Sequence, residues 1–166
     1  MKAKRSGYSL VSRDIASPKE GEDAPLENEA RFRTFFERSA DAMSLLDPQT
    51  LRYIEANEAV ARLLGAPSRE ALRNESPVER WPERQPDGRP SVEKAREMVK
   101  LALTQGSHRF EWFSKRYDGR ELPLDIVMTA VPFGERTLLS LVSELLIPGG
   151  DRAAGHGRKM RPSWRF

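Results

Sequence analysis

Few residues of this chain have the type and spacing that chemistry requires. The 166 residues include two histidines and no cysteine. Without cysteine, the chain has no disulfide, thiolate metal site, cysteine nucleophile or thiol-linked cofactor. Glu111 and Asp125 lie in neighbouring strand-like runs and could approach each other, but no base, nucleophile or metal-ligating cluster accompanies them. We therefore interpret both as solvated surface carboxylates, and we predict no catalytic residue, no metal site and no enzymatic activity.

Asn57 precedes a run with the spacing of an amphipathic helix, "EAVARLLG", which ends at Gly65. Its amide oxygen could cap this helix by accepting a hydrogen bond from an N–H of the first turn. The same amide could instead point at a bound molecule. Capping needs no ligand and is the simpler interpretation, but both roles stay open.

A second group of candidate residues is apolar. Aromatic and aliphatic residues alternate along two neighbouring strand-like runs, over 107–116 and 121–131. Alternation puts them on one face of a sheet, against the apolar stripe of the helix predicted over 91–105. They could line a ligand cavity or form an ordinary apolar core. The candidate cavity residues are Asn57, Val99, Leu103, Phe110, Trp112, Leu124, Ile126 and Met128.

The elements that must position these residues follow from periodicity and from turn residues. The predicted helices cover 26–38, 58–64, 68–74 and 91–105, with a helical turn at 78–81, and the predicted strands cover 42–47, 51–56, 107–116, 121–131 and 135–145. Ser91 is expected to cap the longest helix, and residues 75–90, with four prolines, to form a loop. Only the helices between the second and third strands could cover the sheet, which makes this an α+β fold.

Four stretches have an order and spacing that are specific in combination. They are "EARFRTFFERSADAMSLLD" (29–47), "YIEANEAVARLLG" (53–65), the run from Pro90 to Val131, and "LLSLVS" (138–143). Through them, residues 29–145 resemble the PAS (sensory box) domain of bacterial signalling proteins such as sensor histidine kinases. The resemblance implies a five-stranded antiparallel sheet with helices packed on one face, and a small cavity between the long helix and the sheet. It also implies sensing or dimerisation rather than catalysis.

The resemblance also bears on cofactors. Haem-binding members of the family carry the haem ligand on the long helix, whereas residues 91–106 contain no histidine. His108 lies beyond that helix, so we do not expect it to hold haem. Members that form a flavin adduct need a cysteine, which is absent. We predict no cofactor.

The sequence Ser-Leu-Val-Ser occurs near both ends of the chain, at 9–12 and at 140–143. The second copy should be the central strand of the sheet. The first lies in a stretch, Tyr8 to Ala16, that resembles the exit strand of a preceding PAS domain. We therefore predict that residues 1–28 are a disordered or linker segment with a remnant of that strand, and that residues 146–166 are a basic disordered tail.

Apolar residues near the start of the domain predict dimerisation. Leu26, Phe32, Phe35 and Phe36 have little to bury against in a lone domain and could pair with a second copy. We expect a non-catalytic sensory or interaction module of a bacterial two-component system. It would bind a small ligand or a partner domain, and act as a homodimer or with a PAS-containing signalling partner. The alternative is a truncated remnant of a larger sensor kinase.

Nucleic-acid binding is a further alternative. Five basic residues, together with Trp164 and Phe166, crowd residues 152–166 and could bind phosphates and stack on bases. The acidic segment from Glu20 to Glu29 opposes this, so nucleic acid is not an expected partner.

The sequence also predicts where the protein acts. No apolar run reaches the roughly 18 residues that a membrane span needs. The first residues, "MKAKRSGYSLVS", lack the apolar stretch of a secretory signal. We expect a cytoplasmic protein with no membrane partner.

Overall fold

The computed structural model describes residues 18–147, with side-chain surroundings from Leu26 onward. It forms two units, one up to Arg38 and one from Ser39 onward. The predicted remnant strand at 8–16 and the tail from residue 148 lie outside the described residues. None of the described helices is long and apolar enough to cross a membrane.

The first unit contains the helix α2 (Pro18–Arg38). It begins earlier than the start predicted near Leu26, so residues 18–25 of the predicted linker are helical. A proline fits the first position of a helix, because the N–H that it lacks would have no acceptor within the helix.

The apolar side chains of α2 do not all lie on one side of the helix. Phe32 and Phe36 stack with their ring centroids 5.8 Å apart. Phe35 is 66% exposed, whereas Phe36 is 3% exposed. Leu26 precedes Phe35 by nine residues, about two and a half turns of a continuous helix, so these two side chains point in opposite directions. Leu26 therefore cannot share a contact surface with Phe35.

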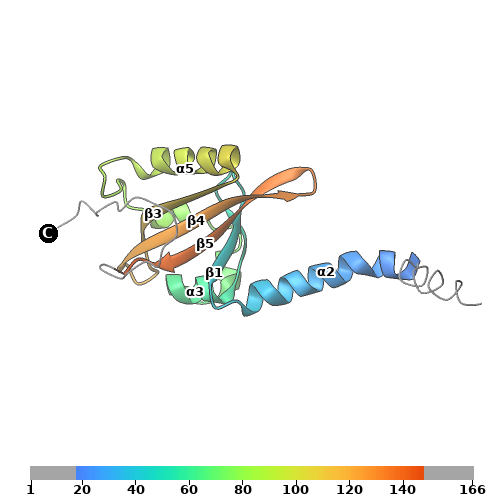
Figure 1. Cartoon of the computed structure of the whole chain (residues 1–166). Helices are drawn as coiled ribbons and strands as arrows, with labels where there is room; N and C mark the ends of the chain where they lie inside the picture. The colour runs from blue at the N-terminus through green and yellow to red at the C-terminus, as the bar shows by residue number, and fades with distance from the viewer. Residues whose placement is uncertain (1–17, 148–166) are drawn as a thin grey trace, which may run out of the picture. The chain divides into compact units, whose positions relative to one another are not determined.

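The second unit is built on an antiparallel sheet with the strand order β2-β1-β5-β4-β3 (Figure 1). The strands are β1 (Ala42–Leu46), β2 (Tyr53–Ala56), β3 (Ser107–Lys115), β4 (Glu121–Phe133) and β5 (Arg136–Leu145). β5 lies between β1 and β4, with Leu139 opposite Leu46 on one side and Ala130 on the other. The predicted five-stranded α+β fold is confirmed, and so is the central position of residues 140–143.

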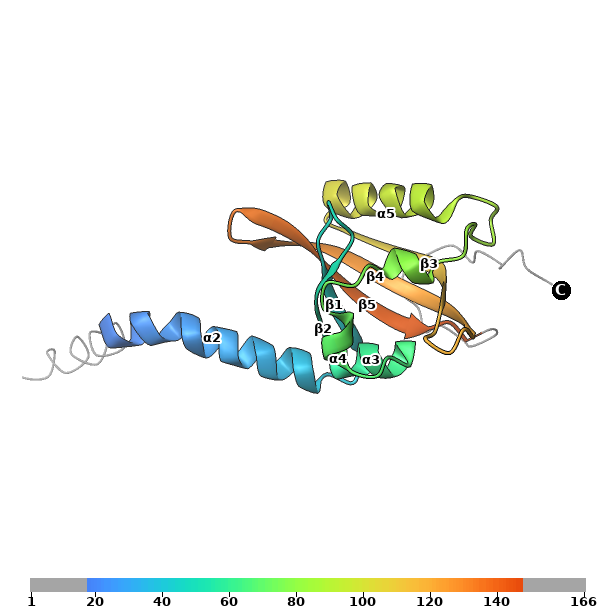
Figure 2. The same ribbon diagram turned by 180° about the vertical axis from the view of Figure 1, so that it is seen from behind.

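Four helices come between β2 and β3 in the chain. They are α3 (Glu58–Leu64), α4 (Arg69–Leu72), the 3-10 helix η1 (Pro77–Arg80) and α5 (Ser91–Gln105). α3 packs against β1, and α5 packs against β3 and β4. These helices lie on the same face of the sheet (Figure 2), as predicted.

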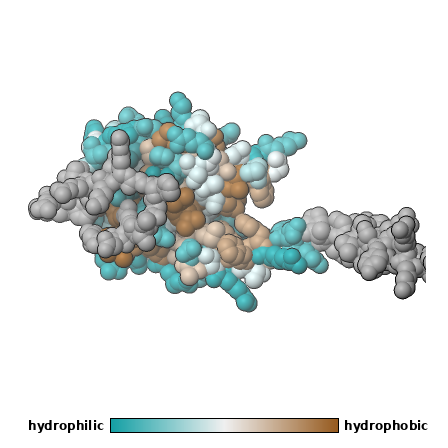
Figure 3. Space-filling view, viewed as in Figure 1, coloured by the Kyte–Doolittle hydropathy of each residue, from teal (hydrophilic) through white to brown (hydrophobic). Residues whose placement is uncertain are grey.

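The other face of the sheet is partly apolar. Figure 3 shows apolar side chains gathered over the strands, with polar ones over α5. Alternation along the strands places the half-buried Met43, Leu45, Val127 and Val142 on this face.

Asn57 ties the start of α3 to β1. Its side chain is fully buried, and its Oδ1 accepts hydrogen bonds from the backbone N–H groups of Val60 and Met43, both at 3.1 Å. Its Nδ2 donates to the carbonyl oxygen of Asp41 at 2.8 Å. The capping interpretation is confirmed, and the same amide also joins two segments that are distant in sequence.

Replacing Asn57 should be far more costly than removing an ordinary helix cap. Asn57→Ala removes the cap and two further buried hydrogen bonds, so we expect the free energy of unfolding to fall by about 3 kcal/mol. Ser68 caps α4 through one bond to Ala71 N–H, so Ser68→Ala should cost about 1 kcal/mol. Urea denaturation of both variants checks this, and equal losses would contradict the double role of Asn57.

Candidate functional site

A cavity of about 60 Å³ lies between α5 and the sheet. Its walls come from α5 (Ala95, Met98, Val99), from α3 and from all five strands. The residues that line it include no charged side chain. Six of the eight candidate residues are brought together here: Val99, Phe110, Trp112, Leu124, Ile126 and Met128.

Leu103 and Asn57 lie elsewhere. Leu103 is 43% exposed and belongs to a separate surface groove, which Arg96 and Lys100 also line. It follows Ala102, the fully buried residue of that turn, by one position, which rotates its side chain by about 100° away from the sheet. The amide of Asn57 is committed to the backbone contacts described above.

Several lining residues were missed by the sequence analysis. Ser44 of β1 and Ser143 of β5 bring hydroxyls to the wall, and Tyr53 comes from β2. Alternation along β1, where Ala42, Ser44 and Leu46 are buried, could have identified the first. Pro77 and Trp81, which also line the cavity, belong to a non-periodic segment that carries no such signal.

That segment, residues 74–90, runs from one edge of the sheet to the other, and we call it the crossing segment (Figure 2). At its start it pairs with the edge strand β2, because Asn74 N–H donates to the carbonyl of Tyr53 and Tyr53 N–H donates to the carbonyl of Glu75. Asn74 adopts a left-handed conformation, with φ of 65°, which asparagine tolerates better than most residues.

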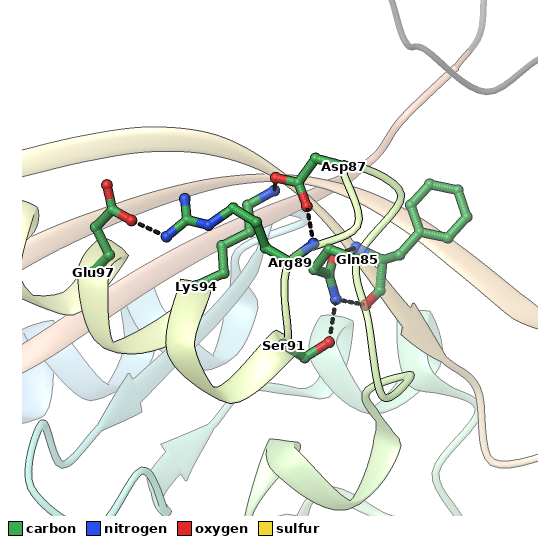
Figure 4. A network of polar contacts seen from close by, with 7 residues as sticks. Gln85, Asp87, Arg89, Ser91, Lys94 and Glu97 are labelled. Atoms are coloured by element: carbon green, nitrogen blue, oxygen red, sulfur yellow. Dashed lines mark hydrogen bonds and ion pairs between the residues drawn. The ribbon is translucent and has the colours of Figure 1, made fainter.

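At its other end, Gln85 fastens the crossing segment to the edge strand β3 (Figure 4). Gln85 is 2% exposed. Its Oε1 accepts from Phe113 N–H at 2.8 Å, and its Nε2 donates to the carbonyl of Phe113 at 3.1 Å. The amide thus bonds the edge strand as a neighbouring strand would.

Ser91 belongs to the same hydrogen-bond network. The prediction that it caps α5 is wrong. Its Oγ accepts from Gln85 Nε2 at 2.9 Å and donates to the carbonyl of Pro82 at 2.5 Å. Pro90 occupies the N-cap position, and α5 has no side-chain cap. The hydroxyl is drawn away from the helix because the crossing segment offers it two partners.

Two ion pairs hold the turn of the crossing segment to α5 (Figure 4). Lys94 Nζ lies 2.9 Å from Asp87 Oδ2, and Arg89 pairs with Glu97. Burial alone would raise the pKa of Asp87, but hydrogen bonds from Lys94 and from the backbone of Arg89 outweigh it and lower that pKa. All these groups are partly exposed, so each pair adds little stability.

A cluster of Glu75, Arg80 and Tyr117 joins the crossing segment to the turn between β3 and β4. The Glu75 carboxylate pairs with Arg80 and accepts a hydrogen bond from the Tyr117 hydroxyl. The Arg80 guanidinium lies over the Tyr117 ring, 3.3 Å from its centroid. Burial, and then the hydrogen bond to Glu75, raise the pKa of Tyr117 to about 12.

The carboxylates noted in the sequence lie on the other face of the sheet. Glu111 and Asp125 are cross-strand neighbours, but Asp125 is 7% exposed and accepts hydrogen bonds from Arg109 Nε at 3.1 and 3.2 Å. The interpretation of Asp125 as a solvated carboxylate is therefore wrong, because the bidentate guanidinium lets this carboxylate be buried. His108 stacks on Phe110. Within residues 18–147, no three His, Asp or Glu side chains gather as metal ligands.

Loss of the Gln85 amide should weaken the whole unit. Gln85→Leu keeps a similar volume but removes three buried hydrogen bonds, so the free energy of unfolding should fall by about 3 kcal/mol. Gln49→Leu changes the same residue type in an exposed turn and should alter stability by less than about 0.5 kcal/mol. Urea denaturation followed by tryptophan fluorescence checks this, and an unchanged midpoint for Gln85→Leu would show that the fastening contributes nothing.

Tyr117 should make stability depend on pH in the alkaline range. Its pKa is about 12 in the folded chain and about 10 when unfolded. The folded state therefore holds the proton more tightly, and the stabilisation is fully present below pH 10 and falls as the pH rises towards 12. Tyr117→Phe should lose less stability than the parent chain over that window, as measured by urea midpoints. Parallel curves for the two proteins would contradict the raised pKa.

Comparison with known proteins agrees with the fold described above. The family model described as PAS fold matches residues 30–143, more than half of the chain. The PAS domain of an HTR-like protein from Haloarcula marismortui has a TM-score of 0.61 and 18% identity, over 77% of this chain and 99% of that chain. The PAS domain of a LuxR-family transcriptional regulator from Burkholderia thailandensis, solved in complex with ethanol, has a TM-score of 0.53 and 17% identity, over 69% of this chain and 96% of that chain.

A curated relative is the methyl sulfide methyltransferase-associated sensor of Methanosarcina acetivorans, which is 26% identical over 125 residues. The alignment covers 73% of this chain and 11% of the relative, so the chain spans about a tenth of that protein's length. The match to the family model and the five-stranded sheet with its helices show that this chain belongs to the PAS fold family, whose domains are typically sensory, non-catalytic modules.

Proposed function

We propose that this chain is a non-catalytic sensory module of a signalling system, such as a two-component system, and that it binds a small molecule in the cavity between α5 and the sheet. The observation that carries the proposal is this cavity, which has no charged side chain in its lining and which the crossing segment also lines. Apolar pockets with few polar groups are the usual form of small-molecule sites. The relative from M. acetivorans is named a sensor, and the B. thailandensis domain was solved with ethanol, which supports the proposal.

The cavity also favours a small ligand over a large cofactor. Its volume of about 60 Å³ is well below the roughly 300–1,000 Å³ of pockets for drug-sized ligands. We therefore propose no role for haem or flavin, in line with the expectation from the sequence.

The same proposal includes a homodimer formed through α2. Phe32 and Phe35 are 49% and 66% exposed, and three residues apart they share one side of the helix. Exposed phenyl rings on one side of a helix are best buried against an equivalent surface, which a second copy supplies. A PAS-containing signalling partner could offer the same kind of surface.

Native mass spectrometry of the purified full chain tests ligand binding and assembly together. We expect the mass of a dimer, with a small added mass that is lost on denaturation. A strict monomer at high micromolar concentration would contradict dimerisation, and an unliganded mass that no small neutral molecule alters would contradict ligand binding.

Substitutions on the two sides of α2 should separate the dimer surface from the rest of the helix. The double change Phe32→Ser and Phe35→Ser removes two phenyl rings from each side of the interface. It should weaken dimerisation by about a hundredfold or more, because the lost burial is worth at least about 3 kcal/mol. Leu26→Ser changes the opposite side and should leave the dimer intact. Light scattering after size exclusion measures both, and equal effects would rule out this surface.

A further inference from the structure

We propose that the surface groove beside α5 binds an amphiphilic anion, that is, a molecule with an apolar chain and an anionic head group, such as a medium-chain carboxylate. The groove is distinct from the cavity between α5 and the sheet, so this inference goes beyond the proposed function. Its volume is about 620 Å³, within the roughly 300–1,000 Å³ of pockets for drug-sized ligands. Two features of its lining carry the proposal, an uncovered apolar surface and a pair of cations without counter-charges.

The apolar part of the groove comes from three segments. α5 contributes Val92 and Leu103, which are 41% and 43% exposed. The turn between β1 and β2 adds Leu51, and the crossing segment adds Val78. Leu51 also lines the cavity, as does Val99 of α5, so these two side chains are shared by the groove and the cavity. An apolar chain in the groove would take this surface out of contact with water, which favours binding.

Two cations of α5 line the same groove. Arg96 and Lys100 are both exposed, and they are four residues apart, so they are neighbours on one side of the helix. Like charges at this spacing repel each other. Within residues 18–147, neither cation forms an ion pair or a side-chain hydrogen bond, whereas Lys94 of the same helix pairs with Asp87. An anion bound to both cations would relieve their repulsion.

The chain does not supply this anion itself. No carboxylate is among the residues that line the groove. Glu97, which follows Arg96 in α5, pairs with Arg89 instead. Asp47, at the start of the turn between β1 and β2, accepts hydrogen bonds from the backbone N–H groups of Gln49 and Thr50 at 2.7 and 3.1 Å. The counter-charge must therefore come from a bound molecule.

An amphiphilic anion fits both features of the groove. A purely apolar molecule would leave the repulsion between the cations in place, and a small inorganic anion would leave the apolar side chains exposed to water. Arg96 and Lys100 lie between Val92 and Leu103 along α5, so a head group bound to the cations has apolar surface on either side along the helix. Guanidinium and ammonium groups both donate charge-assisted hydrogen bonds to a carboxylate.

Octanoate and octan-1-ol provide a matched pair of probes, because they share an eight-carbon chain and only octanoate is charged. We would titrate each into the ¹⁵N-labelled full chain and follow the backbone amide signals. Val92 and Leu103 line the groove and not the cavity, whereas Phe110 and Met128 line the cavity and not the groove. Octanoate should move the signals of the first pair more than those of the second. Its affinity should fall at high salt, which screens exposed charges.

Removal of the two cations should affect the two probes differently. The double change Arg96→Gln and Lys100→Gln should weaken octanoate binding by about tenfold and leave octanol binding unchanged, because each exposed ion pair is worth a factor of up to about five. The double change Arg62→Gln and Lys115→Gln is the matched control, since it removes the same net charge from exposed residues outside the groove. It should leave both affinities unchanged.

Three results would overturn the proposal. Octanoate could move only the signals of the cavity residues, or both double variants could weaken it equally, and in either case the groove is not its site. The signals of Val92 and Leu103 could change when the parent chain alone is diluted, which would show that a second copy covers the groove. Neither probe could move these two signals, whether or not an acidic helical peptide does. The proposed ligand binding in the cavity stands in each case, because it does not depend on the groove.

Discussion

The last strand of the sequence is the central strand of the sheet, and the rest of the second unit depends on its insertion. β5 pairs with β1 along residues 42–46 and with β4 along residues 124–133. Before β5 is in place, β1–β2 and β3–β4 are two separate hairpins, and an isolated hairpin is marginally stable at best in water. Leu141 and Ser143 of β5 also belong to the cavity wall. The cavity therefore exists only in the completed sheet.

The crossing segment also lines the cavity, but hydrogen bonds rather than apolar packing hold it in place. The sheet and α5 meet through apolar packing, whereas residues 74–90 are held at both ends by directed hydrogen bonds. Directed bonds fix the position of Trp81 without filling the space beneath it. This division explains how a small unit with a packed apolar core retains a cavity between α5 and the sheet.

Periodic patterns account for most of what could be predicted from the sequence. Alternation along β3 and β4 identified five of the residues that line the cavity, and helical spacing identified α5. The roles of Gln85 and Ser91 could not be predicted, because the bonds join residues 6 and 28 positions apart in a segment with no period. Leu103 was wrongly assigned to the cavity because it lies one position beyond Ala102, at the margin of the apolar side of α5. α2 was predicted too short because glycine and proline in its first turns are typical of linkers.

The two ends of the crossing segment have a consequence for contacts between molecules. Outer strands of an open sheet expose N–H and C=O groups to which a strand of another chain can add, and this is a common start of ordered aggregation. Here the backbone of Asn74 and Glu75 forms hydrogen bonds with the N–H and C=O groups of Tyr53 in β2. The Gln85 amide does the same with the N–H and C=O groups of Phe113 in β3. A single stretch of chain thus obstructs sheet extension at both margins. Association with other proteins is thereby directed to helices and to the faces of the sheet, where side chains determine which partner fits.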